Sequence, residues 1–594
     1  MGIRKVARRT AAIFAGLAVG VTGLASSSVA TSATVAAPDC PSAYPIDQLQ
    51  PGMQATGYTV TKGTVPEQFG VEILGVLENG IGPGRHMIIV ETSGPAVEKA
   101  HGIWFGMSGS PVYINNQLVG AVAYGLGFGP SKLAGVTPAA DMLDVLDYAG
   151  AGGEGLRAGY KQTVRLTRRQ AAPIARRAGL AIDQVQEFDR LKIPFSVSGL
   201  VGRGLKAVRE AAERENLPII PYTGSSATVE AAQPGGTAVP GGNFAATISY
   251  GDVTSAGIGT TTAVCAGKVL AFGHPFFFEG TTEIGANDAN AITIWDDPVF
   301  GSFKLANVTG LLGTVDQDRL AAIRADLGDM PETVPIRSTV SATNNGNSRD
   351  GATDLVLQEA FSFTAFIHMF QNIDVTYDEI GEGSASLSWT VTGTTESGKS
   401  FELTRDNMFV SDFDISFDSL WEMLGMLDSL QFNKFEDVTF TGFDATEQIE
   451  GEVKSYTLSD AHVSVNGGRY QDTRRLAVSR GDRLRVRAIL EPLDGSANRI
   501  VKLNLRVPRN IRGRTNLNVR GGDQFDGFFC FFRCSDDFGN RVESFEDLLA
   551  TMENSYKNNE LRALIGGRRV KAYDSELLDK VVLGRKRIRL SVVG

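Results

Sequence analysis

The sequence predicts a mainly β protein made of several domains. Short runs of alternating apolar and polar residues, such as GYTVTKGTV, FGVEILGVL and HMIIVET, recur along the 594-residue chain. A period of two is typical of half-buried strands, and the 68 glycines provide turns between them. Hydrophobic residues make up 42% and charged residues 21% of the chain, which is an ordinary globular composition. A chain of this length is expected to form about three or four domains.

The formal net charge is −10, and the isoelectric point is near 5.3. From this balance we expect no basic stripe and therefore no nucleic-acid partner. An acidic surface also disfavours a highly acidic substrate.

The N-terminus has the pattern of an export signal. Four basic residues between positions 4 and 9 precede an apolar stretch from about residue 11 to 25, and small residues follow. We assign residues 1–37 to a signal peptide and expect a secreted or extracytoplasmic protein. An uncleaved N-terminal anchor is the alternative.

Export places the four cysteines in an oxidising compartment, where disulfides persist. Cys530 and Cys534 are close in sequence and are expected to pair. Cys40 and Cys265 remain and could pair with each other. No metal site is expected, because the nearest histidine in sequence to the first pair is distant.

Changes in pattern along the chain divide it into seven segments. Residues 151–242 are rich in arginine and alanine and end in a low-complexity stretch, so helices and a linker are expected there, and DQDRLAAIRADLG at 316–328 is expected to form a short helix. The predicted segments are the signal peptide (1–37), a β region with a serine motif (38–150), a helical and low-complexity linker module (151–242), a β region with a histidine motif (243–330), a mixed β/α region (331–455), a β-sandwich-like domain (456–522) and a C-terminal helix and strand region (523–594).

The first motif is GMSGSP, residues 106–111, followed by a predicted hairpin with a turn at Asn115-Asn116. It is similar to the nucleophile loop of a chymotrypsin-like serine protease. Such a loop needs glycines for a sharp turn and backbone N–H groups beside the serine to hold an oxyanion. We therefore predict Ser108 as nucleophile, with Gly106 and Ser108 as oxyanion donors and Ser110 as the lesser candidate. The alternative is an ordinary glycine-serine turn.

A serine nucleophile needs a base within hydrogen-bond reach. Of five histidines, His274 closes the apolar strand KVLAF and lies between Gly273 and Pro275, which keeps its backbone extended. We predict His274 as the base; a strand-end histidine bonded to a carbonyl is the alternative.

Both motifs resemble the SpoIVB peptidase family of stage IV sporulation serine proteases. GIGTTTAVCAGKVLAFGHPF is similar to the family's histidine segment, and GMSGSPVYINNQLVGAVAYG to its serine segment. The resemblance covers about 45–145 and 245–330. It implies a chymotrypsin-like double β-barrel and an exported endopeptidase that cleaves a protein substrate near a membrane surface or cell wall.

The chain departs from this family in two ways. Ser108 precedes His274, whereas the family has histidine first; a triad is defined by geometry and roles, so a permuted order is compatible with catalysis. The family's aspartate upstream of the serine is also missing. The candidate acids are Glu91, Glu98 and Asp252.

The sequence thus predicts a serine endopeptidase without cofactor or metal, built as a double β-barrel with a helical linker insertion and a C-terminal sandwich-like region. The alternative is a non-catalytic relative that keeps the barrels as a binding or cell-surface module.

Overall fold

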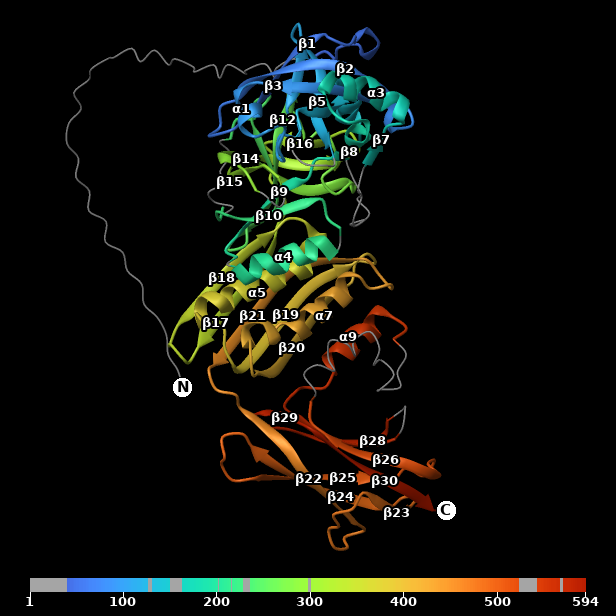
Figure 1. Ribbon diagram of the computed structural model, residues 1–594. Coiled ribbons are helices and arrows are strands. Elements are labelled where there is room, and N and C mark those ends of the chain that lie inside the picture. Colours follow the sequence, from blue (N-terminus) through green and yellow to red (C-terminus); the bar gives the residue numbers. More distant parts are fainter. Residues whose placement is uncertain are drawn as a thin grey trace, which may run out of the picture.

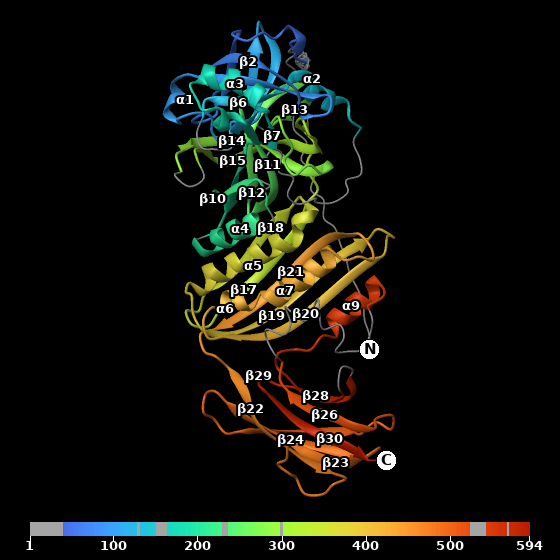
Figure 2. The same cartoon turned by 45° about the vertical axis from the view of Figure 1, so that its right-hand side comes forward.

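Three regions follow one another along an elongated molecule (Figure 1). The computed structural model describes residues 40–126, 131–149, 163–200, 202–214, 216–227, 236–297, 301–522, 542–566 and 570–593. Paired β-barrels occupy one end, a sheet covered by helices forms the middle, and a β-sandwich forms the other end, as the rotated view also shows (Figure 2).

The first barrel is a closed ring of six strands in the order β4-β1-β2-β3-β6-β5, because β5 pairs back onto β4. Its apolar side chains alternate inward and form one core. The predicted turn is confirmed: Asn115 and Asn116 both have positive φ and join β4 to β5. The strands are β1 (Gln54–Thr59), β2 (Glu67–Gly82), β3 (Arg85–Ser93), β4 (Pro111–Ile114), β5 (Gln117–Leu126) and β6 (Leu133–Pro138), with helices α1 (Pro95–Lys99) and α2 (Ala139–Leu143).

The second barrel is also a ring of six strands, in the order β12-β13-β16-β15-β14-β11, closed by pairing of β11 with β12. The chain therefore contains the double β-barrel that the sequence predicts. The strands are β11 (Asn243–Gly251), β12 (Ser255–Cys265), β13 (Lys268–Ala271), β14 (Gly280–Trp295), β15 (Phe303–Asp318) and β16 (Ile323–Leu327).

The helix predicted at 316–328 is wrong. This segment holds the end of β15, a turn and β16. Its alanines, arginines and leucines favour a helix locally, but β16 pairs with both β13 and β15 and completes the second barrel. Tertiary pairing overrides local propensity here.

The segment between the barrels contains the expected helices and four strands besides. The N-cap of α3 is Thr167, which forms a capping box with Gln170. Strands β7 and β8 extend the first sheet beyond β5, and β9 and β10 extend the second beyond β12. The elements are β7 (Thr163–Arg165), α3 (Arg168–Ala178), β8 (Glu187–Arg190), β9 (Ile193–Ser198), α4 (Gly202–Arg214) and β10 (Ile219–Gly224).

The middle region continues the second sheet, because β18 pairs with the end of β11. Helices lie on one face of this sheet (Figure 2), and their apolar side chains join the core shared with the second barrel. The elements are β17 (Val334–Ala342), β18 (Ser348–Leu355), α5 (Phe361–Tyr377), β19 (Gly383–Thr395), β20 (Ser400–Ser411), α6 (Ile415–Asp418), α7 (Trp421–Gln431) and β21 (Val438–Glu450).

The last region is a sandwich of a four-stranded and a five-stranded sheet around its own core. Strands after residue 559 belong to both sheets, so the sandwich includes much of the segment that the sequence set apart as 523–594. The first sheet holds β22 (Ser455–Val465), β24 (Arg483–Pro492), β25 (Arg499–Arg506) and β29 (Val581–Leu583). The second holds β23 (Arg475–Ser479), β26 (Gly513–Arg520), β27 (Glu560–Gly566), β28 (Val570–Leu577) and β30 (Arg585–Val593).

Helix α9 (Phe545–Glu553) begins at its predicted cap, where the Ser544 hydroxyl accepts from the Asp547 N–H. Among the described helices, none combines the length and the apolar character needed to cross a bilayer.

Candidate active site

The serine loop is a tight turn between the two barrels. Gly106 and Gly109 have φ of 90° and 93°, a region that favours glycine. A Cβ atom at Gly109 would lie 2.0 Å from the carbonyl oxygen of Thr260 on β12. The Ser108 carbonyl accepts a hydrogen bond from the Thr260 N–H at 2.9 Å. The loop belongs to the first barrel but is held against the second.

The histidine segment makes the reciprocal contact. It leaves the second barrel after β13, and Phe272 and Gly273 both have positive φ. The Gly273 carbonyl accepts from the Thr137 hydroxyl at 2.6 Å, and a Cβ at Gly273 would lie 3.2 Å from that of Ala121 on β5. Each motif therefore packs on the other barrel, and both meet at the junction.

Ser108 and His274 do not form a hydrogen bond with each other. Ser108 and His274 are fully buried, and neither Ser108 Oγ nor His274 Nε2 has a hydrogen-bond partner among the described residues. Ser110 Oγ is in the same state. The structure places the predicted nucleophile and base in one interface without joining them.

The hydrogen bonds of His274 fix its tautomer. Nδ1 lies 2.7 Å from the carbonyl oxygen of Pro275, which can only accept, so Nδ1 carries the proton and Nε2 presents a lone pair. Arg190 donates to the same carbonyl at 3.1 Å. Burial, with a smaller contribution from the Arg190 charge, lowers the pKa of His274 to about 3. The imidazole is therefore neutral and has the form of a base.

The candidate acids lie elsewhere in the structure. Glu98 on α1 pairs with Lys132 at 2.6 Å, and Asp252 pairs with Arg349 at 2.6 Å. Glu91 stands opposite Glu72 on neighbouring strands. Within the described ranges, no carboxylate hydrogen-bonds to His274. The Pro275 carbonyl holds the position on Nδ1 that the acid of a triad would take.

A carboxylate that the sequence did not single out supports the histidine segment. Asp318, at the end of β15, accepts the N–H groups of Phe276, Phe277 and Phe278 at 2.6–2.7 Å. Burial raises the pKa of this carboxyl, while these three bonds and a longer one from the Glu279 N–H, at 3.4 Å, oppose the shift. Sequence reasoning missed Asp318 because it expected a helix at 316–328 in place of the end of β15.

Two backbone donors of the serine loop have no described hydrogen-bond partner. Met107 N–H donates to Trp104 and Gly109 N–H to Val122, but the N–H groups of Gly106 and Ser108 donate to no described residue. These are the two donors predicted from the sequence. They are two residues apart in a loop whose Phe105 and Ser108 carbonyls are both held by the second barrel, through the N–H groups of Lys304 and Thr260.

A buried lysine lies behind this loop and was missed by sequence reasoning. Lys304 Nζ donates to Asn243 Oδ1 at 3.0 Å and Thr260 Oγ1 at 3.3 Å, and Thr260 Oγ1 donates to the Gly106 carbonyl at 3.1 Å. No described carboxylate pairs with Lys304, and burial lowers its pKa to about 7. A lysine inside the apolar strand FKLAN was the available signal.

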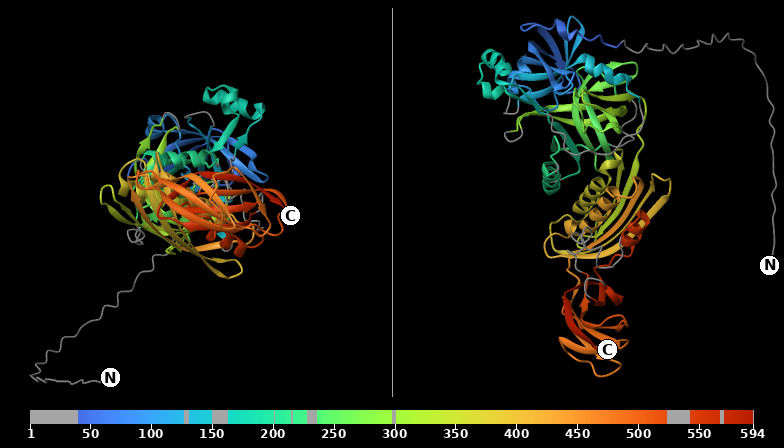
Figure 3. Two further views of the ribbon diagram at one scale, coloured as in Figure 1. Left: turned by 90° about the horizontal axis from the view of Figure 1, so that it is seen from below. Right: turned by 90° about the vertical axis from the view of Figure 1, so that its right-hand side faces the viewer.

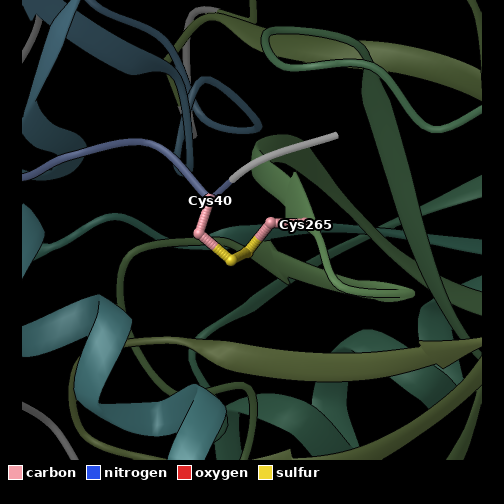
Figure 4. The surroundings of a disulfide bond; sticks show 2 residues. All are labelled: Cys40 and Cys265. Atoms are coloured by element: carbon pink, nitrogen blue, oxygen red, sulfur yellow. A yellow bond between two sulfur atoms is a disulfide. The ribbon is translucent and has the colours of Figure 1, made fainter. Parts of the chain in front are cut away.

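A disulfide joins the N-terminal segment to the second barrel (Figure 4). It links Cys40 to Cys265 at the end of β12, with the Cα atoms 4.7 Å apart. Cys530 and Cys534 lie outside the described residues, as does the predicted signal peptide.

Comparison with known proteins agrees with the resemblance seen in the serine motif. Residues 6–138 match the family model of SpoIVB peptidase S55. The matched range contains the serine loop and ends before His274. For this segment the match supports the predicted family and assignment as a serine peptidase. No curated protein and no solved structure gives a significant match.

Proposed function

From the membership of the serine-bearing segment in the SpoIVB peptidase S55 family, we propose that this chain is an exported serine endopeptidase that cleaves a protein substrate through an acyl-enzyme. The observation that carries the proposal is the reciprocal packing of the two motifs. The Ser108 loop is bonded to β12, and the His274 segment rests on β5.

In the proposed reaction, Ser108 Oγ attacks the scissile carbonyl and His274 Nε2 takes the hydroxyl proton. The N–H groups of Gly106 and Ser108 bind the oxyanion. The tetrahedral intermediate then collapses, and His274 returns the proton to the leaving amine. Water then attacks the acyl-enzyme while His274 takes a proton from it, and His274 returns that proton to Ser108 Oγ as the acid product leaves. The Pro275 carbonyl keeps the proton of His274 on Nδ1 throughout.

The buried state of the pair sets a condition on this reaction. Substrate reaches Ser108 only if the junction between the barrels opens, because Ser108 and His274 are both fully buried. The exposure to water relieves the desolvation that holds the pKa of His274 near 3. The imidazole then becomes a stronger base as substrate enters.

Two features support export. The first 37 residues have the pattern of a signal peptide, and the Cys40–Cys265 disulfide is compatible with an oxidising compartment.

A fluorophosphonate probe tests the proposal, because it reacts with activated serines. The folded wild-type chain should be labelled, Ser108→Ala should not, and Ser110→Ala should still react. Labelling that depends on Ser110 would overturn the assignment of the nucleophile.

A second function is a non-catalytic binding module with the same barrels. The observation in its favour is that Ser108 Oγ and His274 Nε2 are both buried and unbonded. An absence of labelling in correctly folded protein, together with no cleavage of a casein-like substrate, would support this reading.

A further inference from the structure

Charge is divided unevenly along the molecule. The two segments that contain the sandwich strands, residues 455–522 and 560–594, hold 23 lysines and arginines against 9 aspartates and glutamates, a formal net charge of +14. The whole chain carries −10, so the remainder carries −24. This corrects the expectation that the chain has no basic stripe. The sandwich is strongly basic although the net charge of the whole chain is negative.

Many of these cations gather where the sandwich is farthest from the barrels. β22 leads away from the middle region, and its last residue, Val465, pairs with Leu484 near the start of β24. β25 ends and β26 begins at the same end. We call the arginines of these strand ends and turns the basic end: Arg469, Arg483, Arg506, Arg509, Arg512 and Arg514.

The basic end is not neutralised from within the protein. All six side chains are exposed, and none forms an ion pair with a described residue. Arg483 and Arg506 stand directly opposite each other on adjacent strands, an arrangement that destabilises a sheet. The neighbouring Asp482 is engaged in the local turn, where it accepts from the Ser479 N–H at 2.6 Å and the Asn466 amide at 2.8 Å.

The position of the basic end limits what it can bind. The sandwich lies at one end of the molecule and the barrels at the other (Figure 3). A planar negative surface attracts the basic end and repels the acidic remainder. The molecule is therefore oriented with its basic end toward the surface and its long axis pointing away from it. A small soluble anion gives no such alignment.

We propose that the basic end docks the protein onto a lipid bilayer that contains anionic lipids. Cationic side chains are attracted to the negative potential of such a surface within about one Debye length, roughly 10 Å at 0.1 M salt. The barrels then stand on the side of the molecule away from the bilayer. This inference is independent of the proposed peptidase activity.

Vesicle sedimentation of the full chain tests the proposal. The protein should sediment with vesicles that contain phosphatidylglycerol, and 1 M salt should release it. Arg483→Gln with Arg506→Gln should weaken partitioning roughly 25-fold, at about fivefold per cation removed. This pair of changes relieves a like-charge contact and is therefore not expected to impair folding. Arg168→Gln with Arg169→Gln, on exposed positions of α3, makes the same charge change and should alter partitioning less than twofold.

Pure phosphatidylcholine vesicles control for insertion by the apolar N-terminal residues, which does not depend on lipid charge. Equal binding to both vesicle types would overturn the proposal, as would equal losses in the two double variants. Binding to heparin without binding to anionic vesicles would assign the basic end to a soluble polyanion instead. Self-association that disappears in Arg483→Gln with Arg506→Gln, without vesicle binding, would assign it to the acidic surface of a second copy.

Discussion

The imidazole of His274 is oriented by the backbone of the next residue, because its Nδ1 lies 2.7 Å from the Pro275 carbonyl oxygen. In a serine triad a carboxylate usually takes this place, both to fix the tautomer and to stabilise the imidazolium. A carbonyl fixes the tautomer equally well but carries no full charge. The Pro275 carbonyl therefore fixes the tautomer of His274 but supplies no full negative charge for the imidazolium, whereas a triad acid does both.

The first prediction concerns the three carboxylates suggested by the sequence. Glu91→Gln, Glu98→Gln and Asp252→Asn should each leave probe labelling and peptide cleavage within a few-fold of wild type, because none bonds to His274. Loss of a true triad acid costs about 10⁴ in kcat. A loss of that size in any of the three variants, with folding intact, would identify the missing acid.

The second prediction concerns Ser108 and His274, the proposed catalytic pair. Ser108→Ala and His274→Ala should each abolish cleavage of a casein-like substrate, and the double variant should lose little more than either alone, since the two groups act as a unit. Circular dichroism should show that all three remain folded. Additive losses would mean that the residues act independently.

The third prediction concerns the contact between the serine loop and the second barrel. Gly109→Ala should give an insoluble or strongly destabilised protein, because the new methyl would meet the Thr260 carbonyl at 2.0 Å and the Phe272 nitrogen at 2.6 Å. Gly63→Ala is the matched control: φ there is also positive, at 74°, but nothing lies within 4 Å of the added atom. The control should lose only about 1–2 kcal/mol of unfolding free energy. Similar thermal unfolding of both variants would contradict the described packing.

The fourth prediction concerns pH and Lys304. Its pKa is about 7 in the folded protein and 10.5 as the ordinary value. Between these values the unfolded chain binds the additional proton, so this lysine makes the folded barrel more stable as pH rises from 7 to 10. The slope from one proton is about 1.4 kcal/mol per pH unit.

Lys304→Met should remove that slope, measured by hydrogen exchange of β12 and β15 at several pH values. Lys62→Met, at an exposed position, should leave it unchanged. A slope that survives in Lys304→Met would show that another group titrates in this window.

The fifth prediction concerns the disulfide. Cys40→Ser with Cys265→Ser should lower the free energy of unfolding, by roughly 5 kcal/mol in the chain-entropy description, because the bond closes a loop across 225 residues of sequence. Non-reducing peptide mapping of the wild-type chain should recover the two cysteines in one linked pair of peptides. Recovery of both as free thiols under denaturing conditions would refute the bond.

The sequence was most informative where a local pattern is sufficient. The Asn115-Asn116 turn, the Ser544 cap and the glycines around Ser108 depend on backbone conformations that few residue types adopt, so short motifs reveal them. Asp318 and Lys304 could not be found in this way. Their roles depend on contacts between strands that are distant in the chain, and local helix propensity around residue 320 indicated a different structure.

Because each motif packs on the other barrel, the order of synthesis decides when the contacts between the barrels can form. The serine loop around residue 108 is synthesised before the histidine segment around residue 274, and Asp318, which accepts hydrogen bonds from that segment, is synthesised later still. A chain emerging from the ribosome holds a serine loop without its partner strand β12 until more than 150 further residues are made. The contacts that hold the Ser108 and His274 segments therefore form only after β12, β13 and Asp318 have been made.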